Sequence, residues 1–311
     1  MTRAPDSRST SQIPRTPRQA RDSHLESERW RRVLIWGLRA FPLPLQRATM
    51  PLWSAFFYAQ VPRARRAIQS NLSRLLGLRP PQLQVAAFRT FTNYCQSIAD
   101  AYLPYVGLDP GLGVELSGAE HLRRILRPGL GAILTTGHLG SWQLGPLYLN
   151  EHGFPPVTVV MTEEPDRGAQ QLVAGLRDRE TRVVYPGRSP LLALELRAAL
   201  LRGELVAFQM DRPSTDAGLS VPFAGGTATF AAGPAVLART CGAPLVPVFF
   251  PVRGRRIRIQ VEPPLRARRT DNREADILAL TAELARVYER VVRRYPEQWF
   301  NFYDFFSGSP P

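Results

Sequence analysis

The stretch Gly131–Gln143, with the sequence GAILTTGHLGSWQ, decides the fold of this 311-residue chain. Its first half is short, apolar and β-branched near its end, which predicts a buried strand over Gly131–Thr136. Glycines on both sides of His138 loosen the backbone where this strand ends, and Ser141 is suited to cap a following helix. We therefore expect His138 in a strand-to-helix turn at the carboxyl end of a strand, where open α/β sheets bind ligands. The plainer alternative is a structural histidine.

Strands and helices alternate along the rest of the chain. Apolar and β-branched runs predict strands at Val114–Ser117, Gly131–Thr136, Pro156–Met161, Arg182–Tyr185, Leu205–Gln209, Leu245–Phe250 and Ile257–Val261. Periodic segments predict helices at Glu120–Leu126, Ser141–Glu151, Arg167–Arg179, Pro190–Arg202, Gly233–Cys241 and Asp271–Tyr295. This alternation predicts an α/β domain over residues 111–311, with a mostly parallel central sheet flanked by helices.

The first 110 residues have a different character. Residues 1–28 are rich in Arg, Ser, Thr and Pro and poor in apolar residues, which predicts a disordered tail. Residues 29–110 predict a helical region that begins with two short aromatic helices over Trp30–Val61. Arginines and prolines interrupt that stretch, so it lacks the ~20 apolar residues of a membrane-spanning helix. It suits a membrane interface, or alternatively a helical hairpin packed on the domain.

Two further helices are expected in this region. Arg63–Leu76 is basic and amphipathic, and a long helical pattern runs from Gln82 to about Tyr105. A basic helix of this kind is most often a solvated face, and the sharper alternative is a contact with lipid phosphates or an acidic carrier protein.

The composition limits the partners and the chemistry. The formal charge is +14, and every basic residue is arginine. A positive surface suits anionic lipid, an acidic protein or nucleic acid, but no nucleic-acid-binding motif is visible, so we expect no nucleic-acid partner. The two cysteines and four histidines have neither disulfide nor metal-ligand spacing, so no metal site is expected.

His138 has the chemistry of a general base, because its ordinary pKa of about 6.5 suits proton removal near neutral pH. Such a base needs a partner that fixes its tautomer and stabilises the imidazolium. Gln143 lies in the first turn of the predicted helix, where it could fold back on the ring, but its amide cannot offset a positive charge. Asp211 follows the strand Leu205–Gln209 and is the best candidate for the acid that Gln143 does not supply. The alternative for Asp211 is an aspartate that forms a turn before the next Arg-Pro pair.

The segment GHLGSWQLG resembles the H-x4-D/E box of the lysophospholipid acyltransferase superfamily, in its lipid A late (lauroyl/myristoyl) acyltransferase branch. Other segments resemble that branch in the same order, namely RRAIQSNL, FQMDRP, VPFAGGTATFAAGPAVLARTCGAPLVPVF and YPEQWFNFY. The resemblance covers roughly Ile35–Phe306 and implies an αβα sandwich like that of the glycerolipid acyltransferases. It departs from the branch at Gln143, where the family carries Asp or Glu.

The resemblance implies an enzyme on the cytoplasmic face of the bacterial inner membrane. Such an enzyme moves a fatty acyl chain from acyl carrier protein or acyl-CoA to a hydroxyl of a lipid or glycolipid, with no cofactor beyond the acyl thioester. His138 would deprotonate that hydroxyl, which attacks the thioester directly. Ser141 is not expected as a nucleophile, because Leu139 replaces the first glycine of a G-x-S-x-G elbow. Gln143 leaves three readings open: a slower enzyme, an acid supplied from elsewhere, or an inactive homologue that binds lipid.

Several residues near the predicted strand ends are candidate substrate ligands. Glu163 and Glu164 follow the strand that ends at Met161, although a solvated loop is the alternative. The family places a site arginine in a region that matches Arg177 or Arg179, where a cation could bind phosphate or polarise the thioester carbonyl. A further candidate is Arg212.

Two motifs near the end of the chain have both a functional and a plain interpretation. The glycine-rich segment GGTATFAAG could let backbone N–H groups approach an anion, and the alternative is a simple glycine turn. Its candidate residues are Gly225, Gly226, Thr229 and Gly233. The aromatic tail could line an acyl slot or touch the bilayer, or it could belong to the core. Its members are Trp299, Phe300, Phe302, Tyr303, Phe305 and Phe306.

Overall fold

The computed structural model describes residues 28–126, 130–163, 166–168, 170–171, 181–213 and 218–306. Four helices come first: α1 (Glu28–Ala40), α2 (Leu43–Gln60), α3 (Pro62–Leu76) and α4 (Gln82–Tyr102). The later helices are α5 (Ala119–Ile125), α6 (Gly145–Glu151), α8 (Leu192–Leu201), α9 (Gly233–Cys241) and α10 (Arg273–Arg294). The predicted helix Arg167–Arg179 lies mostly outside the described residues.

Eight strands of the described chain form one sheet. They are β1 (Gly113–Ser117), β2 (Ala132–Thr136), β3 (Val157–Val160), β4 (Arg182–Val184), β5 (Leu205–Gln209), β8 (Leu245–Phe249), β9 (Val252–Arg253) and β10 (Arg256–Val261). Along the sheet the order is β1-β10-β8-β2-β5-β3-β4, with β9 paired to β10. The five strands from β8 to β4 are parallel, and β10 joins β8 in the antiparallel sense. The predicted fold class, a mostly parallel sheet flanked by helices, is confirmed.

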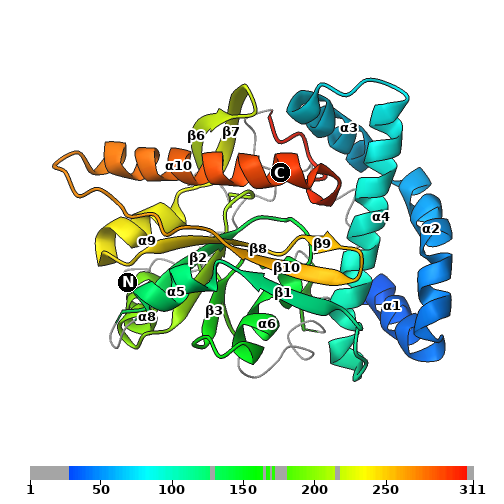
Figure 1. Cartoon of the computed structure of the whole chain (residues 1–311), viewed down its shortest axis with the longest axis horizontal. Coiled ribbons are helices and arrows are strands. Elements are labelled where there is room, and N and C mark those ends of the chain that lie inside the picture. Colours follow the sequence, from blue (N-terminus) through cyan, green and yellow to red (C-terminus); the bar gives the residue numbers. More distant parts are fainter. Residues whose placement is uncertain are drawn as a thin grey trace, which may run out of the picture.

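The two faces of the sheet carry separate apolar cores, because side chains alternate along each strand. Ile133 and Val206 point to the core that includes residues of α8, α9 and α10. Leu134 and Leu205 point to the other core, which includes residues of α5 and α6. Figure 1 shows α10 lying along one face of the sheet.

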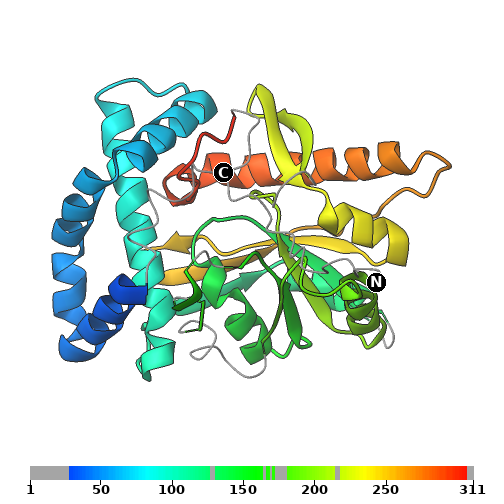
Figure 2. The same cartoon turned by 180° about the vertical axis from the view of Figure 1, so that it is seen from behind.

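Helices α1–α4 gather at one end of the molecule, as Figures 1 and 2 both show. Parts of α2, α3 and α4 share an apolar cluster that also reaches Phe302 near the end of the chain. The sequence left open whether the aromatic N-terminal helices pack on the domain, and they do. In the part of the chain that the structure describes, no helix is both long and apolar enough to cross a membrane.

The first two helices nevertheless leave many large apolar side chains in contact with solvent. Trp36 is 63% exposed and Trp53 is 56% exposed. On α2 the exposed apolar residues follow helical spacing and so share one side of the helix. The exposed set is Trp30, Val33, Trp36, Phe41, Leu45, Leu52, Trp53 and Phe56.

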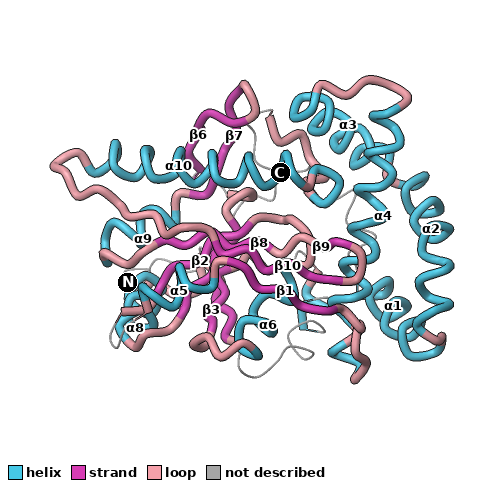
Figure 3. Tube along the Cα trace, viewed as in Figure 1, coloured by secondary structure: helices cyan, strands magenta, loops and turns pink. Residues whose placement is uncertain are grey.

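A hairpin that the sequence did not predict stands beside the main sheet, as Figure 3 shows. It consists of β6 (Gly218–Phe223) and β7 (Gly226–Ala231), paired antiparallel. Its two-residue turn has positive φ at both Ala224 and Gly225, which matches the twist of the strands that it joins. From the sequence, the glycine-rich segment has two interpretations, an anion-binding segment or a simple glycine turn, and its strands are missed because Ala, Thr and Gly give a weak strand pattern.

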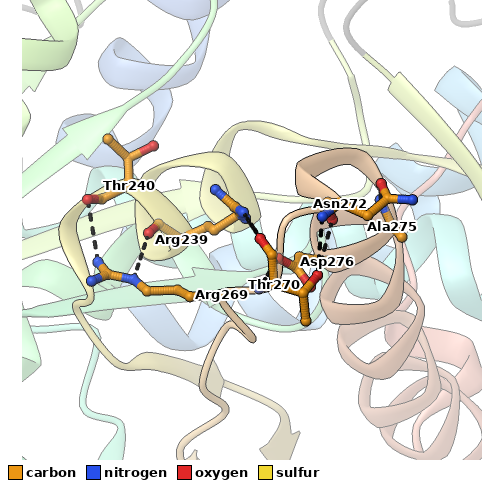
Figure 4. A network of polar contacts seen from close by, with 7 residues as sticks. All are labelled: Arg239, Thr240, Arg269, Thr270, Asn272, Ala275 and Asp276. Carbon is orange, nitrogen blue, oxygen red and sulfur yellow. Dashed lines mark hydrogen bonds and ion pairs between the residues drawn. The ribbon is translucent and has the colours of Figure 1, made fainter.

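A polar network fixes the start of α10 against α9, as Figure 4 shows. The buried Asp276 carboxylate accepts hydrogen bonds from Arg239 Nε (2.9 Å) and from both the amide and the hydroxyl of Thr270 (2.9 Å each). Asn272 caps the helix by accepting from the Ala275 amide at 3.0 Å. This network fixes the first turn of α10 against α9.

We expect the Asp276→Ala variant to lower the thermal midpoint of unfolding by several degrees, because Arg239 and Thr270 lose their shared acceptor. Burial opposes ionisation of Asp276, but its bonds with Arg239 and Thr270 lower its pKa below the ordinary value. Its contribution is therefore present at neutral pH and is lost as the pH falls through the folded-state pKa. The control is Glu274→Ala, an exposed acid of the same helical turn. Equal midpoints in both variants would contradict this account.

Candidate active site

The register of two parallel strands brings His138 and Asp211 together. Strands β2 and β5 are neighbours, and Thr136 pairs with Gln209, so each candidate follows its paired position by two residues. Asp211 Oδ1 lies 2.8 Å from the imidazole Nδ1 of His138, and Asp211 Oδ2 accepts from the His138 backbone amide at 2.9 Å. The carboxylate therefore holds both the ring and the backbone of the histidine.

Asp211 is fully buried and collects hydrogen bonds from three directions. Besides His138, Oδ2 accepts from the Tyr288 hydroxyl at 2.7 Å and from Asn301 Nδ2 at 2.9 Å. Burial alone would raise the pKa of this carboxyl, but the facing His138 and Arg212 and the Tyr288 hydroxyl hold that pKa below its ordinary value. The group is thus an ionised carboxylate surrounded by donors.

The surroundings of the His138 ring favour its neutral form. Burial lowers its pKa, the nearby Arg212 lowers it further, and Asp211 opposes both effects. A carboxylate partner at Nδ1 assigns the ring proton to that nitrogen, which leaves the Nε2 lone pair free to accept a proton. No described residue hydrogen-bonds to Nε2. The whole residue is 8% exposed, and Trp142 packs edge-on against its ring at 5.1 Å between centroids.

Two glycines shape the loop around His138. A Cβ at Gly137 would overlap the ring of Tyr288, so glycine permits the tyrosine to reach Asp211. Gly140 has φ +63°, a left-handed conformation that glycine adopts without strain. The loop is held further by Phe300, whose amide donates to the His138 carbonyl at 2.8 Å, and by the Gln298 carbonyl, which accepts from the Gly140 amide at 3.1 Å.

Gln143 forms no hydrogen bond with the His138 imidazole in the described part of the chain. Its Oε1 lies 3.4 Å from the hydroxyl of Ser97 on α4, whose one proton it shares with the nearer Gly140 carbonyl at 3.0 Å. The expectation that Gln143 folds back on the His138 ring is therefore wrong, because Asp211 occupies the Nδ1 side. The prediction that Ser141 caps a helix is also wrong. A 3-10 turn, η3 (Trp142–Leu144), separates Ser141 from α6, and its buried hydroxyl has no hydrogen-bond partner within the described part of the chain.

The other polar candidates are distributed around this pair. Glu163 is exposed and forms an ion pair with Arg188. Arg212 turns toward the end of the chain, donating from Nε to Asn301 Oδ1 at 3.1 Å and from Nη2 to the Phe300 carbonyl at 2.6 Å. Three predicted substrate ligands, Glu164, Arg177 and Arg179, lie outside the described residues.

The glycine-rich candidates belong mostly to the β6–β7 hairpin. Gly225 is in its turn, and the neighbouring Ala224 amide donates to Glu289 Oε2 at 2.8 Å. An acid at this turn disfavours a second anion there, so the structure supports the plain-turn alternative. Thr229 lies within β7, paired with Ser220. Gly233 begins α9 with Pro234 behind it, as the sequence predicted for that helix.

The aromatic tail frames the site and packs into the core. Trp299 pairs with Leu139 of the His138 loop through an isolated antiparallel bridge, and Phe300 lies near Trp142 at 5.8 Å between ring centroids. Four tail residues are buried, namely Trp299, Phe300, Phe305 and Phe306. The core interpretation of this tail therefore holds for these residues.

Sequence reasoning missed Tyr288 and Asn301, which both donate to Asp211. Tyr288 is an apolar-face residue of an amphipathic helix, which normally signals only packing. Asn301 stands among aromatic residues, and that isolated polar position was the one available signal.

A surface cavity of about 240 Å³ lies where α3, α4 and the end of α10 meet. Leu72, Leu76, Asn93 and residues 294–298 contribute to its lining, whereas His138 and Asp211 do not. The described residues contain no group of three or more metal-ligating side chains.

Comparison with known proteins identifies the class. The sequence pattern of the family described as "Bacterial lipid A biosynthesis acyltransferase" matches residues 28–306, and the chain belongs to this family. The family and the relatives below support an acyltransferase that acts on a lipid or glycolipid.

Two curated proteins that are similar to this chain have the same name. The chain is 28% identical over 243 residues to the phosphatidylinositol mannoside acyltransferase of Mycobacterium tuberculosis, covering 75% of this chain and 74% of that protein. It is also 28% identical over 240 residues to the protein of the same name from Mycolicibacterium smegmatis, covering 75% of this chain and 76% of that protein.

We expect Asp211→Asn to lower the His138 pKa below its wild-type value, because the amide retains an acceptor but removes the negative charge. Gln143→Glu should change that pKa less, because residue 143 faces Ser97. An NMR titration of the four histidines, assigned with a His138→Gln variant, measures both shifts. A raised His138 pKa in Asp211→Asn would refute the assignment of Asp211 as the ring's charged partner.

Proposed function

We propose that this protein transfers a fatty acyl group from an acyl thioester to a hydroxyl of a membrane glycolipid, with His138 as general base and Asp211 as its charged partner. The observation that carries the proposal is the 2.8 Å contact between Nδ1 and a fully buried carboxylate. This contact leaves Nε2 as the basic nitrogen, which is the arrangement that a direct attack by an alcohol requires.

In the proposed reaction, His138 both accepts the proton and gives it back. Nε2 takes the proton of the acceptor hydroxyl while the hydroxyl oxygen attacks the thioester carbonyl carbon. The carbon–sulfur bond then breaks, and the imidazolium returns the proton to the leaving thiolate. Asp211 stabilises the imidazolium between these steps, and no acyl-enzyme forms. Because His138 must be neutral to act, activity should fall as the pH drops below the His138 pKa.

The acid supplied by Asp211 favours an active enzyme over an inactive lipid-binding homologue. Gln143 was the sequence feature that supported an inactive site, since an amide cannot balance an imidazolium. Here the charge that offsets the imidazolium comes from Asp211, two residues beyond β5. Ser141 has a buried hydroxyl with no hydrogen-bond partner among the described residues, which is consistent with direct attack and not with a serine nucleophile.

The similar mycobacterial proteins favour a glycolipid acceptor. Both are named as acyltransferases of phosphatidylinositol mannosides, in which the acceptor carries sugar hydroxyls. We therefore extend the proposal to a sugar hydroxyl of an anionic glycolipid. Acyl carrier protein and acyl-CoA both remain candidate donors, because a net charge of +14 attracts either one.

We further propose that α1 and α2 hold the protein at the cytoplasmic surface of the bacterial inner membrane. Their exposed tryptophans and phenylalanines are the side chains that enter the interface of a bilayer. Arg29, Arg32 and Arg39 are exposed on α1 and would meet anionic headgroups.

Acyl transfer from a radiolabelled long-chain acyl-CoA, or from acyl carrier protein, into extracted bacterial glycolipid tests the chemistry. We expect His138→Ala to reduce transfer to background, whereas His152→Ala, a histidine that bonds to the Tyr148 carbonyl, retains it. Asp211→Asn should reduce the rate by up to about 10⁴-fold, the loss that this change causes in a serine protease. Gln143→Glu should keep or raise activity. Equal transfer by His138→Ala and wild type would reject the proposal that this protein is an acyltransferase with His138 as its general base.

Vesicle binding tests the membrane surface. Replacing Trp36 and Trp53 together with serine should reduce binding to phosphatidylglycerol-containing vesicles severalfold, because two exposed aromatic anchors are lost. The matched control is Leu201→Ser on α8, which also removes an exposed apolar side chain. Unchanged binding in the tryptophan variant, or an equal loss in the control, would remove α1 and α2 from membrane attachment.

A further inference from the structure

The segment after η5 (Pro296–Gln298) supplies several of the groups that hold Asp211. Asn301 Nδ2 donates to Asp211 Oδ2 at 2.9 Å, and the Tyr303 hydroxyl donates to the Asp211 backbone carbonyl at 2.6 Å. Phe300 holds the His138 carbonyl from the same segment at 2.8 Å. This short stretch therefore contacts both members of the proposed catalytic pair. It has no regular secondary structure of its own, so something else must fix its path.

Asn71 of α3 makes three hydrogen bonds to the backbone of that segment. Its Nδ2 donates to the carbonyls of Asn301 (3.0 Å) and Tyr303 (2.8 Å), and its Oδ1 accepts from the Phe305 amide at 3.0 Å. Both amide protons and the amide oxygen are thus used on one stretch of chain. The side chain is 2% exposed and lies 230 residues before Asn301 in the sequence.

We propose that Asn71 is a positioning residue for the catalytic pair: it fixes the backbone of residues 301–305 so that Asn301 meets the Asp211 carboxylate that orients His138. The proposal rests on the proposed function and adds a role for a residue of the N-terminal helices. It also gives a purpose to the segment RRAIQSNL, in which Asn71 is the one fully buried polar residue.

The geometry distinguishes this role from ordinary packing. A leucine of similar size would fill the space between α3 and the tail, as Leu72 and Leu75 of the same helix fill theirs. A buried amide is costly unless each of its groups is paired, and here each pairs with a backbone group of the segment that carries Asn301. Arg212 braces the far side of Asn301 through Oδ1 at 3.1 Å. The Asn301 amide is therefore held from its backbone and from its side chain.

A second contact from the helical layer supports the same arrangement. Ser97 of α4 donates to the Gly140 carbonyl at 3.0 Å, within the loop that carries His138. The helical layer thus contacts the histidine loop through Ser97 and the aspartate's partner through Asn71. The relative placement of His138 and Asp211 depends on both contacts as well as on the sheet.

The test measures the hydrogen-bonded imidazole proton directly and does not require turnover. NMR measures the rate at which the proton between His138 Nδ1 and Asp211 exchanges with solvent. The groups that face this pair and affect its ionisation are Arg212, Tyr288 and Tyr303, and all of them are left unchanged. We expect Asn71→Ala to speed the exchange of this proton severalfold, because the carboxylate loses its fixed position.

The control is Asn272→Ala, which removes a side-chain hydrogen bond at the start of α10. It makes the same chemical change and destabilises the fold without touching the tail. Its imidazole proton should exchange at the wild-type rate. If the Asn71→Ala chain does not fold, Asn71→Asp keeps the shape and the acceptor for Phe305 and removes the amide donors, and the same increase is expected.

A double-mutant cycle on acyl transfer separates positioning from general destabilisation. We expect Asn71→Ala to reduce kcat by about 10-fold to about 100-fold, with KM for the acyl-CoA unchanged, since small misplacements cost rates of this order. In the Asn301→Ala background the same change should add little, because its effect passes through Asn301. The proposal would be overturned if the losses in kcat of Asn71→Ala and Asn301→Ala multiply in the double variant. It would also be overturned if the imidazole proton of Asn71→Ala exchanges at the wild-type rate. Transfer that survives His138→Ala would instead refute the function and leave the exchange result to decide the role of Asn71.

Discussion

The structure of this site depends on one buried anion. Asp211 has no exposed surface, and an isolated carboxylate in such a place would be strongly destabilising. It is tolerated because His138, Tyr288 and Asn301 direct donors at it from the loop after β2, from α10 and from the tail. The need to satisfy this carboxylate therefore explains why three distant parts of the chain converge at the end of the sheet.

Under the proposed function, this constraint also accounts for Gln143, which stands where the H-x4-D/E pattern has an acid. The negative charge that an H-x4-D/E box would supply from five residues after the histidine is available here from the neighbouring strand. Gln143 is then free to bond with Ser97 and to connect the loop with α4. A histidine–carboxylate pair is thus compatible with glutamine at position 143, because Asp211 supplies the negative charge from another part of the chain.

The N-terminal helices combine packing on the domain with an exposed aromatic surface, two features that the sequence presented as alternatives. They pack on the domain through α4 and the end of the chain, and they also expose a set of aromatic residues. Under the proposed function, the surface that would bind lipid and the residues that hold the catalytic pair belong to one helical layer. Asn71 and the exposed tryptophans therefore belong to the same structural unit.

The sequence by itself determined the strands of the main sheet except β9, and most of the described helices, because alternating apolar residues and glycine punctuation are local signals. It also located His138 and Asp211 at strand ends, although only the parallel register of β2 and β5 decided that they touch. The hairpin β6–β7, the true partner of Gln143, and the donors Tyr288, Asn301 and Asn71 came only from the tertiary structure. The side-chain contacts among these join residues 46 to 234 positions apart, and no local pattern encodes which distant groups a buried carboxylate or amide will meet.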